Sequence, residues 1–464
     1  MRALASPFAL SAFVLAAALT GFAPQIFNDA DTWWHLAAGD WILAHRAVPV
    51  RDFFTHTFAG IPWNAHEWLS EVLMALAYRA GGWSGLYILF GGAFGITAAV
   101  VAGTMRRQVD IIPAFVVSML GLACVSGSLL ARPHLLALPL LALWTVTLVD
   151  ARRRDVAPSF WLAAVMLIWA NLHGSFALGL ALTLALGFEA VAASRERLQT
   201  AQAWGTFFAV AILAALATPQ GLEGLLFPAR LLTMPGMASI GEWRPADLTR
   251  PAPFLLAVGA LILVLAAEKV RLPKFRALLV VAFLYLGLAH VRHQMLFGIV
   301  APLLAGPALG IIWPASPQVE ARWSRPLLTT LVLGLIVVRL MLPTARGEDR
   351  VSPVAALAHV PVALRGKPVL NAYDYGGYLI HQGVPVFIDG RTDLYPSDFM
   401  KADDRLAAGD EAALMATLAR YHIAWTIYPA GSAAAKALDG LAGWRRLYAD
   451  GNAVVHVPQQ QPPG

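Results

Sequence analysis

Residues 84–105 read SGLYILFGGAFGITAAVVAGTM and are followed at once by Arg106 and Arg107. This run carries no charged residue and reaches the ~20 residues that an α-helix needs to cross a bilayer. The chain of 464 residues is 58% hydrophobic and only 13% charged, and its mean hydropathy is +0.62. A soluble globular domain carries about 25% charged residues. The sequence therefore predicts an α-helical polytopic membrane protein.

Similar runs recur along the chain and predict about eleven transmembrane helices. Clusters of arginine and lysine follow alternate runs, which is the positive-inside pattern of membrane proteins. This pattern accounts for the net charge of +6, so the charge is not a sign of nucleic-acid binding. The spans are expected at 6–24, 84–105, 110–130, 134–150, 157–172, 175–193, 202–218, 252–267, 276–292, 294–313 and 326–343, and the cytoplasmic clusters at Arg106–Arg107, Arg152–Arg154, Arg195 with Arg197, Lys269–Arg276, and Arg322 with Arg325.

The composition changes near residue 343, which predicts two domains. Residues 1–343 are expected to form the transmembrane domain, including a long outer loop at 25–83 in which a helix at 67–79 follows the membrane surface. Residues 344–464 are expected to form a small α/β domain, which helix parity places outside the cytoplasm. Its strands are expected at 368–370, 384–388, 423–428 and 453–457, and a helix at 411–421.

Two features bear on how the chain is processed. The first apolar run, after Arg2, resembles a signal peptide, but we interpret it as an uncleaved first helix. Cys124 is the single cysteine and lies within an apolar run. The chain therefore has no internal disulfide and no cysteine metal site.

Every histidine of the membrane-embedded part falls on the outer side in this topology, and several acids, arginines and an asparagine join them there. Ionisable groups near lipid are costly and usually functional, so the gathering predicts a reaction site at this face. The residues are His35, His45, His56, His66, His134, His173, His290 and His293, together with Asp29, Asp31, Glu67, Arg132, Asn171, Glu242, Arg244 and Arg292.

The first outer loop opens with two carboxylates, Asp29 and Asp31, just beyond a membrane helix. One carboxylate can act as a general base while the other holds a metal ion or orients a substrate. A structural interpretation is also open, because Asp31 is a fair N-cap for a helix at 32–44. Trp33 and Trp34 fit an interfacial aromatic belt.

A second polar stretch follows at Trp63–Glu71. Asn64 with Glu67 three positions later is typical of a capping box at a helix start. Glu71 lies one turn beyond Glu67, so both can line one helix face. The alternative is that His66 and Glu67 contact the substrate directly.

Cationic residues open several later outer segments. Arg132 precedes Pro133 at a helix start, where its guanidinium can bind a phosphate or extend to lipid headgroups. His290 and His293 lie one helical turn apart, a spacing that suits metal or phosphate binding as well as simple hydrogen bonding. Glu242 and Arg244 are spaced for a surface ion pair. The Asn171–Gly174 turn needs its Asn and Gly but does not need His173.

No Walker A loop, GxSxG elbow or dinucleotide fingerprint occurs in the sequence. An ATP-driven pump is therefore not indicated.

The stretch DADTWWHLAAG at 29–39 resembles the first outer loop of GT-C-fold membrane glycosyltransferases. It is more closely similar to a bacterial branch that opens with DxDxWWHLxxG. The resemblance continues through 49–57 and 63–71 and returns at 371–379 and 387–393. It implies a multi-pass protein of the bacterial inner membrane with a GT-C-like helical domain.

The resemblance also implies an activity. GT-C enzymes transfer a sugar from a polyprenyl-phosphate donor to an acceptor outside the cytoplasm, and an acidic residue of the first outer loop serves as base or metal ligand. That role carries over to Asp29 or Asp31, so a divalent metal is a candidate cofactor. Asp374-Tyr375-Gly376 resembles part of the acceptor-binding motif of oligosaccharyltransferases. The two tryptophan positions before it are Ala372 and Tyr373 here, so protein N-glycosylation is not implied, and a glycine turn is the alternative.

The resulting hypothesis is an inverting transferase that uses a polyprenyl-phosphate-linked sugar and a glycan, lipid or protein acceptor. Asp29 or Asp31 takes the proton of the acceptor hydroxyl, and the leaving phosphate needs cations aimed at it. The terminal domain is expected to act as a lid or acceptor platform. The phosphate candidates are Arg132, Arg244, Arg292, His290 and His293; other site-lining candidates are His35, His66, Glu67, His134, Asn171, His173 and Glu242; and the acceptor-side candidates are Asp374, Tyr375, Asp389, Arg391 and Asp393.

Three other classes stay open. A glycan polymerase or ligase of the O-antigen type would depend more on Arg244 and Arg292 than on the aspartates. A transporter would need charges near the middle of the membrane, where the predicted spans have few. A non-catalytic protein that binds lipid-linked glycan would share the same site residues.

Overall fold

The computed structural model describes residues 6–231, 241–267, 270–317, 323–342, 344 and 346–459. The described residues form two compact units. Unit 1 holds those in Met1–Ala23, Ser84–Leu232 and Ala238–Leu342, and unit 2 holds those in Pro24–Trp83 and Pro343–Gly464. The long helix α3 (Trp68–Gln108) contributes to both, and its backbone is non-helical at Gly81 and Gly82.

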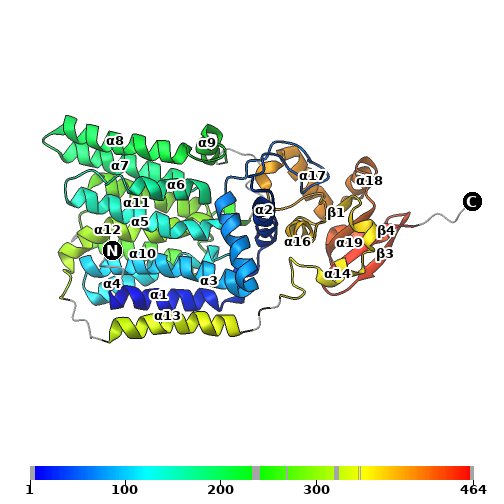
Figure 1. Cartoon of the computed structure of the whole chain (residues 1–464), viewed down its shortest axis with the longest axis horizontal. Coiled ribbons are helices and arrows are strands. Elements are labelled where there is room, and N and C mark those ends of the chain that lie inside the picture. The colour runs from blue at the N-terminus through cyan, green and yellow to red at the C-terminus, as the bar shows by residue number, and fades with distance from the viewer. Residues whose placement is uncertain are drawn as a thin grey trace, which may run out of the picture. The chain divides into compact units, whose positions relative to one another are not determined.

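Unit 1 is a bundle of helices whose axes run nearly side by side (Figure 1). Its helices are α1 (Pro7–Gly21), the later part of α3, α4 (Ile111–Ala123), α5 (Pro133–Arg153), α6 (Leu162–Leu172), α7 (Phe176–Ala193), α8 (Arg197–Leu216), α9 (Leu222–Leu231), α10 (Pro253–Ala266), α11 (Lys274–Ala289), α12 (Gln294–Ile312) and α13 (Ser324–Met341), with 3-10 turns η2 (Ser126–Ser128), η4 (Gly241–Trp243) and η5 (Val291–His293).

Seven helices of the described chain are long and apolar enough to cross a membrane, and three more are apolar but shorter. The chain is therefore a membrane protein. Each span expected from the sequence coincides with a helix of unit 1. The count of about eleven crossings stays a prediction, because several of these helices are shorter than a bilayer requires. Lys269 and Arg322 of the expected cytoplasmic clusters lie outside the described residues.

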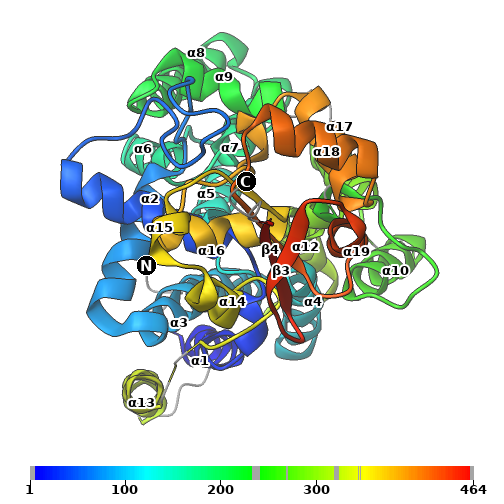
Figure 2. The same ribbon diagram turned by 90° about the vertical axis from the view of Figure 1, so that its right-hand side faces the viewer.

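Close packing in unit 1 depends on small residues at one crossing. Gly121 of α4 meets Gly298 of α12, and a Cβ atom on either would collide with the carbonyl oxygen of the other. Small residues at such crossings let membrane helices approach backbone to backbone. The α13 helix is different, because it packs on α1 and is exposed over most of its length (Figure 2).

One buried carboxylate in unit 1, that of Glu189, is paired with arginines from two other helices. Arg276 of α11 donates to both carboxylate oxygens of Glu189 on α7, with Nη2 to Oε1 at 3.0 Å. Nε of Arg152 on α5 lies 3.4 Å from the same carboxylate. A charge buried among apolar helices is tolerated when an opposite charge compensates it. These residues therefore link three helices rather than form a site at mid-membrane.

Unit 2 combines the first loop with the terminal segment. The elements before the bundle are η1 (Pro24–Phe27), α2 (Asp31–His45) and residues 68–80 of α3. Those after it are α14 (Val354–His359), α15 (Val362–Arg365), β1 (Val369–Asn371), η6 (Tyr373–Tyr375), α16 (Gly376–His381), η7 (Thr392–Leu394), α17 (Ser397–Ala407), α18 (Glu411–Arg420), β2 (Trp425–Pro429), α19 (Ala433–Gly440), β3 (Trp444–Ala449) and β4 (Ala453–Pro458).

The strands form one sheet with the order β1-β2-β4-β3. β1 is parallel to β2, and β4 is antiparallel to both of its neighbours. The helix α19 contacts both β2 and β3. It lies next to β3 in Figure 2. The strands expected at 368–370, 423–428 and 453–457 and the helix expected at 411–421 are confirmed.

One expected strand was wrong and one strand was missed. Residues 384–388 make only an isolated bridge, in which Val386 pairs with Thr55 of the first loop. The missed strand is β3, an edge strand with mostly exposed side chains. Its sequence WRRLYA lacks the alternation of apolar and polar residues that marks a half-buried strand. The helix expected at 67–79 is confirmed as the first part of α3.

A buried ion network joins the first loop to the terminal segment within unit 2. Arg391 donates to Asp389 through Nε and Nη2, at 2.9 and 2.7 Å, and through Nη1 to Asp52 at 2.7 Å. The side chains of all three are fully buried. Tyr395 donates to Asp389 at 2.8 Å, and the guanidinium lies 4.7 Å from the ring centroid of Trp63.

This network explains why residues 24–83 group with the terminal segment, whereas the sequence assigned them to the transmembrane domain. Asp52 and Arg391 lie 339 positions apart, and two buried charges can be satisfied only if their segments meet. The helices α2 and α16 also pack together. The contact is long-range, so neither local pattern nor composition could have indicated it.

We predict that Arg391→Met destabilises unit 2 by about 3–5 kcal/mol, because it leaves two carboxylates buried without their cation. Urea titration of the full-length protein in detergent, followed by tryptophan fluorescence, measures the change. The matched control is Arg405→Met, whose exposed pair with Asp410 should contribute less than about 1 kcal/mol. Equal losses in the two variants would show that the buried network has no special weight.

Candidate functional site

The candidate residues form two groups, one in each unit. In unit 2 they surround the start of α2, and in unit 1 they surround Trp243 of η4. Each group is described within its own unit.

The two aspartates of the first loop differ in their surroundings. Asp29 is buried, with 3% of its surface exposed. Its Oδ1 accepts from the backbone N–H of Asp31 at 3.4 Å, and its Oδ2 accepts from Oγ1 of Thr32 at 3.5 Å. Asp29 therefore supports the first turn of α2, a task that the sequence had assigned to Asp31. That N-cap prediction was wrong, since Ala30 holds the N-cap position and Asp31 is the first helical residue.

Asp31 is half-buried, and its carboxylate accepts a hydrogen bond from a side chain. Its Oδ1 accepts from the indole N–H of Trp34 at 3.1 Å. The Trp34 ring stacks on the ring of His35 with centroids 3.6 Å apart. Of the two aspartates, Asp31 is thus the more exposed one.

A cluster of acids and histidines surrounds His35 on the first part of α2 and includes residues at the start of α3. Nδ1 of His35 is 3.4 Å from Glu71, and its Nε2 is 4.0 Å from Glu67. Nε2 of His66 lies 3.7 Å from Glu67. Burial raises the pKa of Asp393, against the opposing effect of His66 and Arg391. These groups can share protons among themselves, which makes the cluster a candidate for proton handling.

Glu71 belongs to this cluster, but it was not predicted from the sequence as a site residue. It is 1% exposed, and its Oε2 has no hydrogen-bond partner among the described residues. The available signal was its position one turn beyond Glu67. The expected capping box was wrong, because α3 begins at Trp68 and Oδ1 of Asn64 is buried without a hydrogen bond.

The residues expected to face an acceptor have different places. Asp389 and Arg391 are fully buried in the ion network, and Asp393 is half-buried and interacts electrostatically with both. Tyr375 is buried and donates to the backbone oxygen of Asn452 at 2.9 Å. Of this set only Asp374 is exposed. The terminal motifs therefore serve mainly to build unit 2 in this structure.

In unit 1 the cationic candidates gather around one tryptophan. Trp243 is 8% exposed, and the guanidinium carbon of Arg292 lies 4.9 Å from its ring centroid. His290 and His293 meet the same ring edge-on at 5.1 and 5.7 Å. The Nδ1 of His290 is hydrogen-bonded to the backbone oxygen of Trp243 at 2.8 Å. The sequence pointed to the charges on either side of this tryptophan but missed its central place.

Arg132 completes the group, because its Nη1 is 3.1 Å from Glu242 in a half-buried ion pair. Arg132 and Arg292 both act electrostatically on His134, which places them near it. Arg244 is exposed, and its backbone oxygen accepts from Val291. The structure thus brings Arg132, Arg292, His290 and His293 to one end of the bundle.

The remaining outer candidates have local structural partners. Nε2 of His134 is hydrogen-bonded to the backbone oxygen of Ser128 at 2.7 Å. Nδ1 of His173 accepts from the backbone N–H of Ser175 at the start of α7. Asn171 donates to the backbone oxygens of Leu167 and Ala217 and so fixes its turn. These three side chains therefore stabilise the turns that lie between the helices of unit 1.

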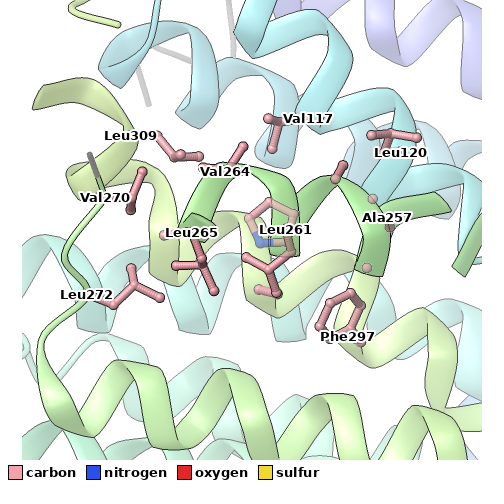
Figure 3. Close-up of a pocket in the computed structure, with 16 residues that line it drawn as sticks. Val117, Leu120, Ala257, Leu261, Val264, Leu265, Val270, Leu272, Phe297 and Leu309 are labelled. Atoms are coloured by element: carbon pink, nitrogen blue, oxygen red, sulfur yellow. The ribbon is translucent and has the colours of Figure 1, made fainter. Parts of the chain in front are cut away.

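An apolar cavity lies between α4, α10 and α12 (Figure 3). Every side chain that lines it is apolar, among them Leu261 of α10 and Phe297 and Leu309 of α12. Phe297, which lines the cavity, follows His293 of the cationic group by four positions, about one helical turn along α12. From Phe297 to Leu309 the cavity follows about 18 Å of helix.

Within the described ranges, no group of three or more His, Cys, Asp and Glu side chains is arranged to hold a metal ion. A divalent metal at Asp29 or Asp31 therefore stays a prediction from the family resemblance.

The fold is similar to that of a known membrane transferase. No family model and no curated protein matches the chain. The crystal structure of the oligosaccharyltransferase of Archaeoglobus fulgidus in the apo form superimposes with a TM-score of 0.55 at 11% identity, covering 91% of this chain and 69% of that one. The oligosaccharyltransferase AglB of the same organism, in complex with an inhibitory peptide and a dolichol-phosphate, gives 0.49 at 12% identity with the same coverage. The first likeness shows a shared fold.

A buried acid near Asp374 generates a prediction on pH. Burial and the neighbouring Asp404 and Asp374 raise the pKa of Asp403 to about 7. A raised acid pKa means that the folded state binds the extra proton, so stability falls as pH rises from about 4 to 7. Asp403→Asn should stabilise the protein by roughly 2–4 kcal/mol at pH 8 and leave it nearly unchanged at pH 4.

Thermal unfolding of the two proteins across this pH range tests the point. Asp398→Asn on the same helix is the control, because the Asp398 side chain is 99% exposed. A gain that is the same at every pH would contradict the assignment to Asp403.

Proposed function

We propose that the chain is a glycosyltransferase that takes a sugar from a polyprenyl-phosphate donor and transfers it, with inversion, to a glycan, lipid or protein acceptor on the extracytoplasmic face. The observation that carries this proposal is the cationic group around Trp243 at the start of the apolar cavity. An anionic headgroup on a long hydrocarbon chain needs both features side by side. The shared fold with an oligosaccharyltransferase fits a transferase of glycans.

The cations supply what the leaving group requires. As the bond from the sugar to phosphate breaks, negative charge grows on the phosphate oxygens, and fixed donors aimed at that charge stabilise the transition state. Arg292 is held by the Trp243 ring, and Arg132 is held by Glu242. Guanidinium groups bind phosphate through paired, charge-assisted hydrogen bonds. His290 and His293 are neighbours that can donate further hydrogen bonds.

The apolar cavity accounts for the lipid part of the donor. Along about 18 Å of α12 it offers only hydrocarbon to a bound chain. Gly121 and Gly298 bring α4 and α12 together at its wall. A prenyl tail lying there places its phosphate beside His293 and Arg292.

Asp31 is proposed as the base. The acceptor hydroxyl gives its proton to the Asp31 carboxylate, the hydroxyl oxygen bonds to the anomeric carbon, and the bond from that carbon to the phosphate oxygen breaks. The electron pair leaves with the polyprenyl phosphate. Asp29 is proposed to support the turn that carries Asp31, because both of its oxygens already accept hydrogen bonds from that turn.

Donor binding gives the first test. Arg292→Gln should weaken the binding of undecaprenyl phosphate to the purified full-length protein roughly 10- to 100-fold, since a charge-assisted hydrogen bond is lost. Leu261→Trp should weaken it by filling the cavity. Native mass spectrometry across a lipid titration measures both changes.

Two controls match these variants. Arg197→Gln removes an exposed arginine at the start of α8, and Leu263→Trp adds the same bulk on α10 at a side chain that is 73% exposed. If the test variants bind like the controls, the lipid phosphate is held elsewhere.

Transfer activity gives the second test. Asp31→Asn should lower transfer about 10²- to 10⁴-fold, the usual contribution of a general base. Membrane vesicles containing the full-length protein, supplied with labelled polyprenyl-phosphate sugars, provide the assay. Asp40→Asn is the control, because Asp40 lies on the same helix in an exposed pair with Arg79.

Three other results would point to the other classes. Full activity in Asp31→Asn with loss in Arg244→Gln would favour a polymerase or ligase. Bound lipid without transfer by the wild type would favour a binding protein. Movement of the lipid-linked sugar across the vesicle membrane without transfer would favour a transporter.

A further inference from the structure

Two glycines of the terminal motifs lie against the start of α2. A Cβ atom on Gly390 would overlap Oδ1 of Asp31, far inside van der Waals contact. A Cβ atom on Gly377 would likewise overlap the backbone oxygen of Ala30. Both glycines belong to stretches, 371–379 and 387–393, whose other members are mostly buried. The absence of side chains at these positions is what lets the terminal segment touch Asp31.

Gly390 cannot easily withdraw from this contact. Its two neighbours, Asp389 and Arg391, are hydrogen-bonded to each other. Oδ1 of Asp389 accepts from the backbone N–H of Arg391 and from Nε of the same residue, both at 2.9 Å. Arg391 is also paired with Asp52. The peptide around Gly390 is therefore fixed to the first loop by fully buried charges.

The same carboxylate oxygen of Asp31 also accepts a hydrogen bond from Trp34. The indole N–H donates to Oδ1 of Asp31 at 3.1 Å, and the indole is 7% exposed. Its ring is kept in place by His35 at 3.6 Å and Trp63 at 6.3 Å between centroids. Oδ1 thus lies between a fixed donor and a fixed glycine.

We propose that Gly390 and Trp34 are positioning residues that set the orientation of the Asp31 carboxylate. This inference rests on the proposed function, in which Asp31 is the base. It assigns a new role to the terminal motif at 387–393, which is to hold the carboxylate of the base in one orientation. A misplacement of about 1 Å in a reacting group can lower a rate about 10²-fold, so a fixed carboxylate has a clear kinetic value.

The expected result for Gly390→Ala follows from this geometry. The added methyl group turns the Asp31 carboxylate away, and kcat falls about 10²-fold while KM is unchanged. Because Gly390 acts through Asp31, the double variant with Asp31→Ala should be no slower than Asp31→Ala alone. Trp34→Phe keeps an aromatic ring on His35 and removes the N–H, so it should behave in the same way.

A second readout does not need activity. Gly390→Ala should lower the apparent melting temperature of the full-length protein, and this loss should shrink in the Asp31→Ala background, where the overlapping oxygen is gone. Gly366→Ala is the control, because a Cβ atom there meets nothing within 4 Å.

The outcomes separate the two proposals. Coupling in melting temperature together with non-additive kcat supports the positioning role. Coupling in melting temperature with transfer that does not depend on Asp31 overturns the proposed base and, with it, the positioning role, while the contact itself stands. Multiplicative losses in kcat, or a Gly390→Ala protein that matches Gly366→Ala in both readouts, overturn the inference directly.

Discussion

The structure of unit 2 depends on the burial of Arg391 between Asp52 and Asp389. A guanidinium without water is tolerated only with its counter-charges in place, so the first loop and the terminal segment must fold together. This constraint places Gly390 against Asp31, because Gly390 lies between the two bonded residues of the terminal segment. The buried ion network thereby fixes the surroundings of Asp31, the proposed base. The terminal segment is thus tied to the proposed base more directly than an acceptor platform would be.

Unit 1 has a different constraint, because it must accommodate charged arginine side chains at the ends of an apolar helix bundle. The buried Arg276 is paired with Glu189, whereas the half-buried Arg292 lies over the ring of Trp243. The Trp243 ring holds this guanidinium beside His290 and His293, an arrangement of donors that suits binding of an incoming anion. The apolar cavity starts about one helical turn away, and this combination is what favours a lipid-linked phosphate over a soluble one.

The sequence predicted what is local or periodic and missed what is long-range. Apolar runs and arginine clusters located every helix of the bundle except α9, and the grouping of Arg132, Arg292, His290 and His293 at one end followed from parity alone. The strand expected at 384–388 failed because its apolar residues are buried by the first loop and not by a sheet. The contact of Gly390 with Asp31 was not predictable, because glycine in a DGR tripeptide reads equally well as a turn. The separate tasks of Asp29 and Asp31 required the hydrogen bonds themselves.

The most direct test of the account is a structure of the full-length protein in a lipid nanodisc with undecaprenyl phosphate. We predict that the phosphate is bound by Arg292 and Arg132 beside Trp243, with the prenyl chain along Leu261 and Phe297. A phosphate bound at any other place, or a chain lying only on the outer surface of the bundle, would contradict it.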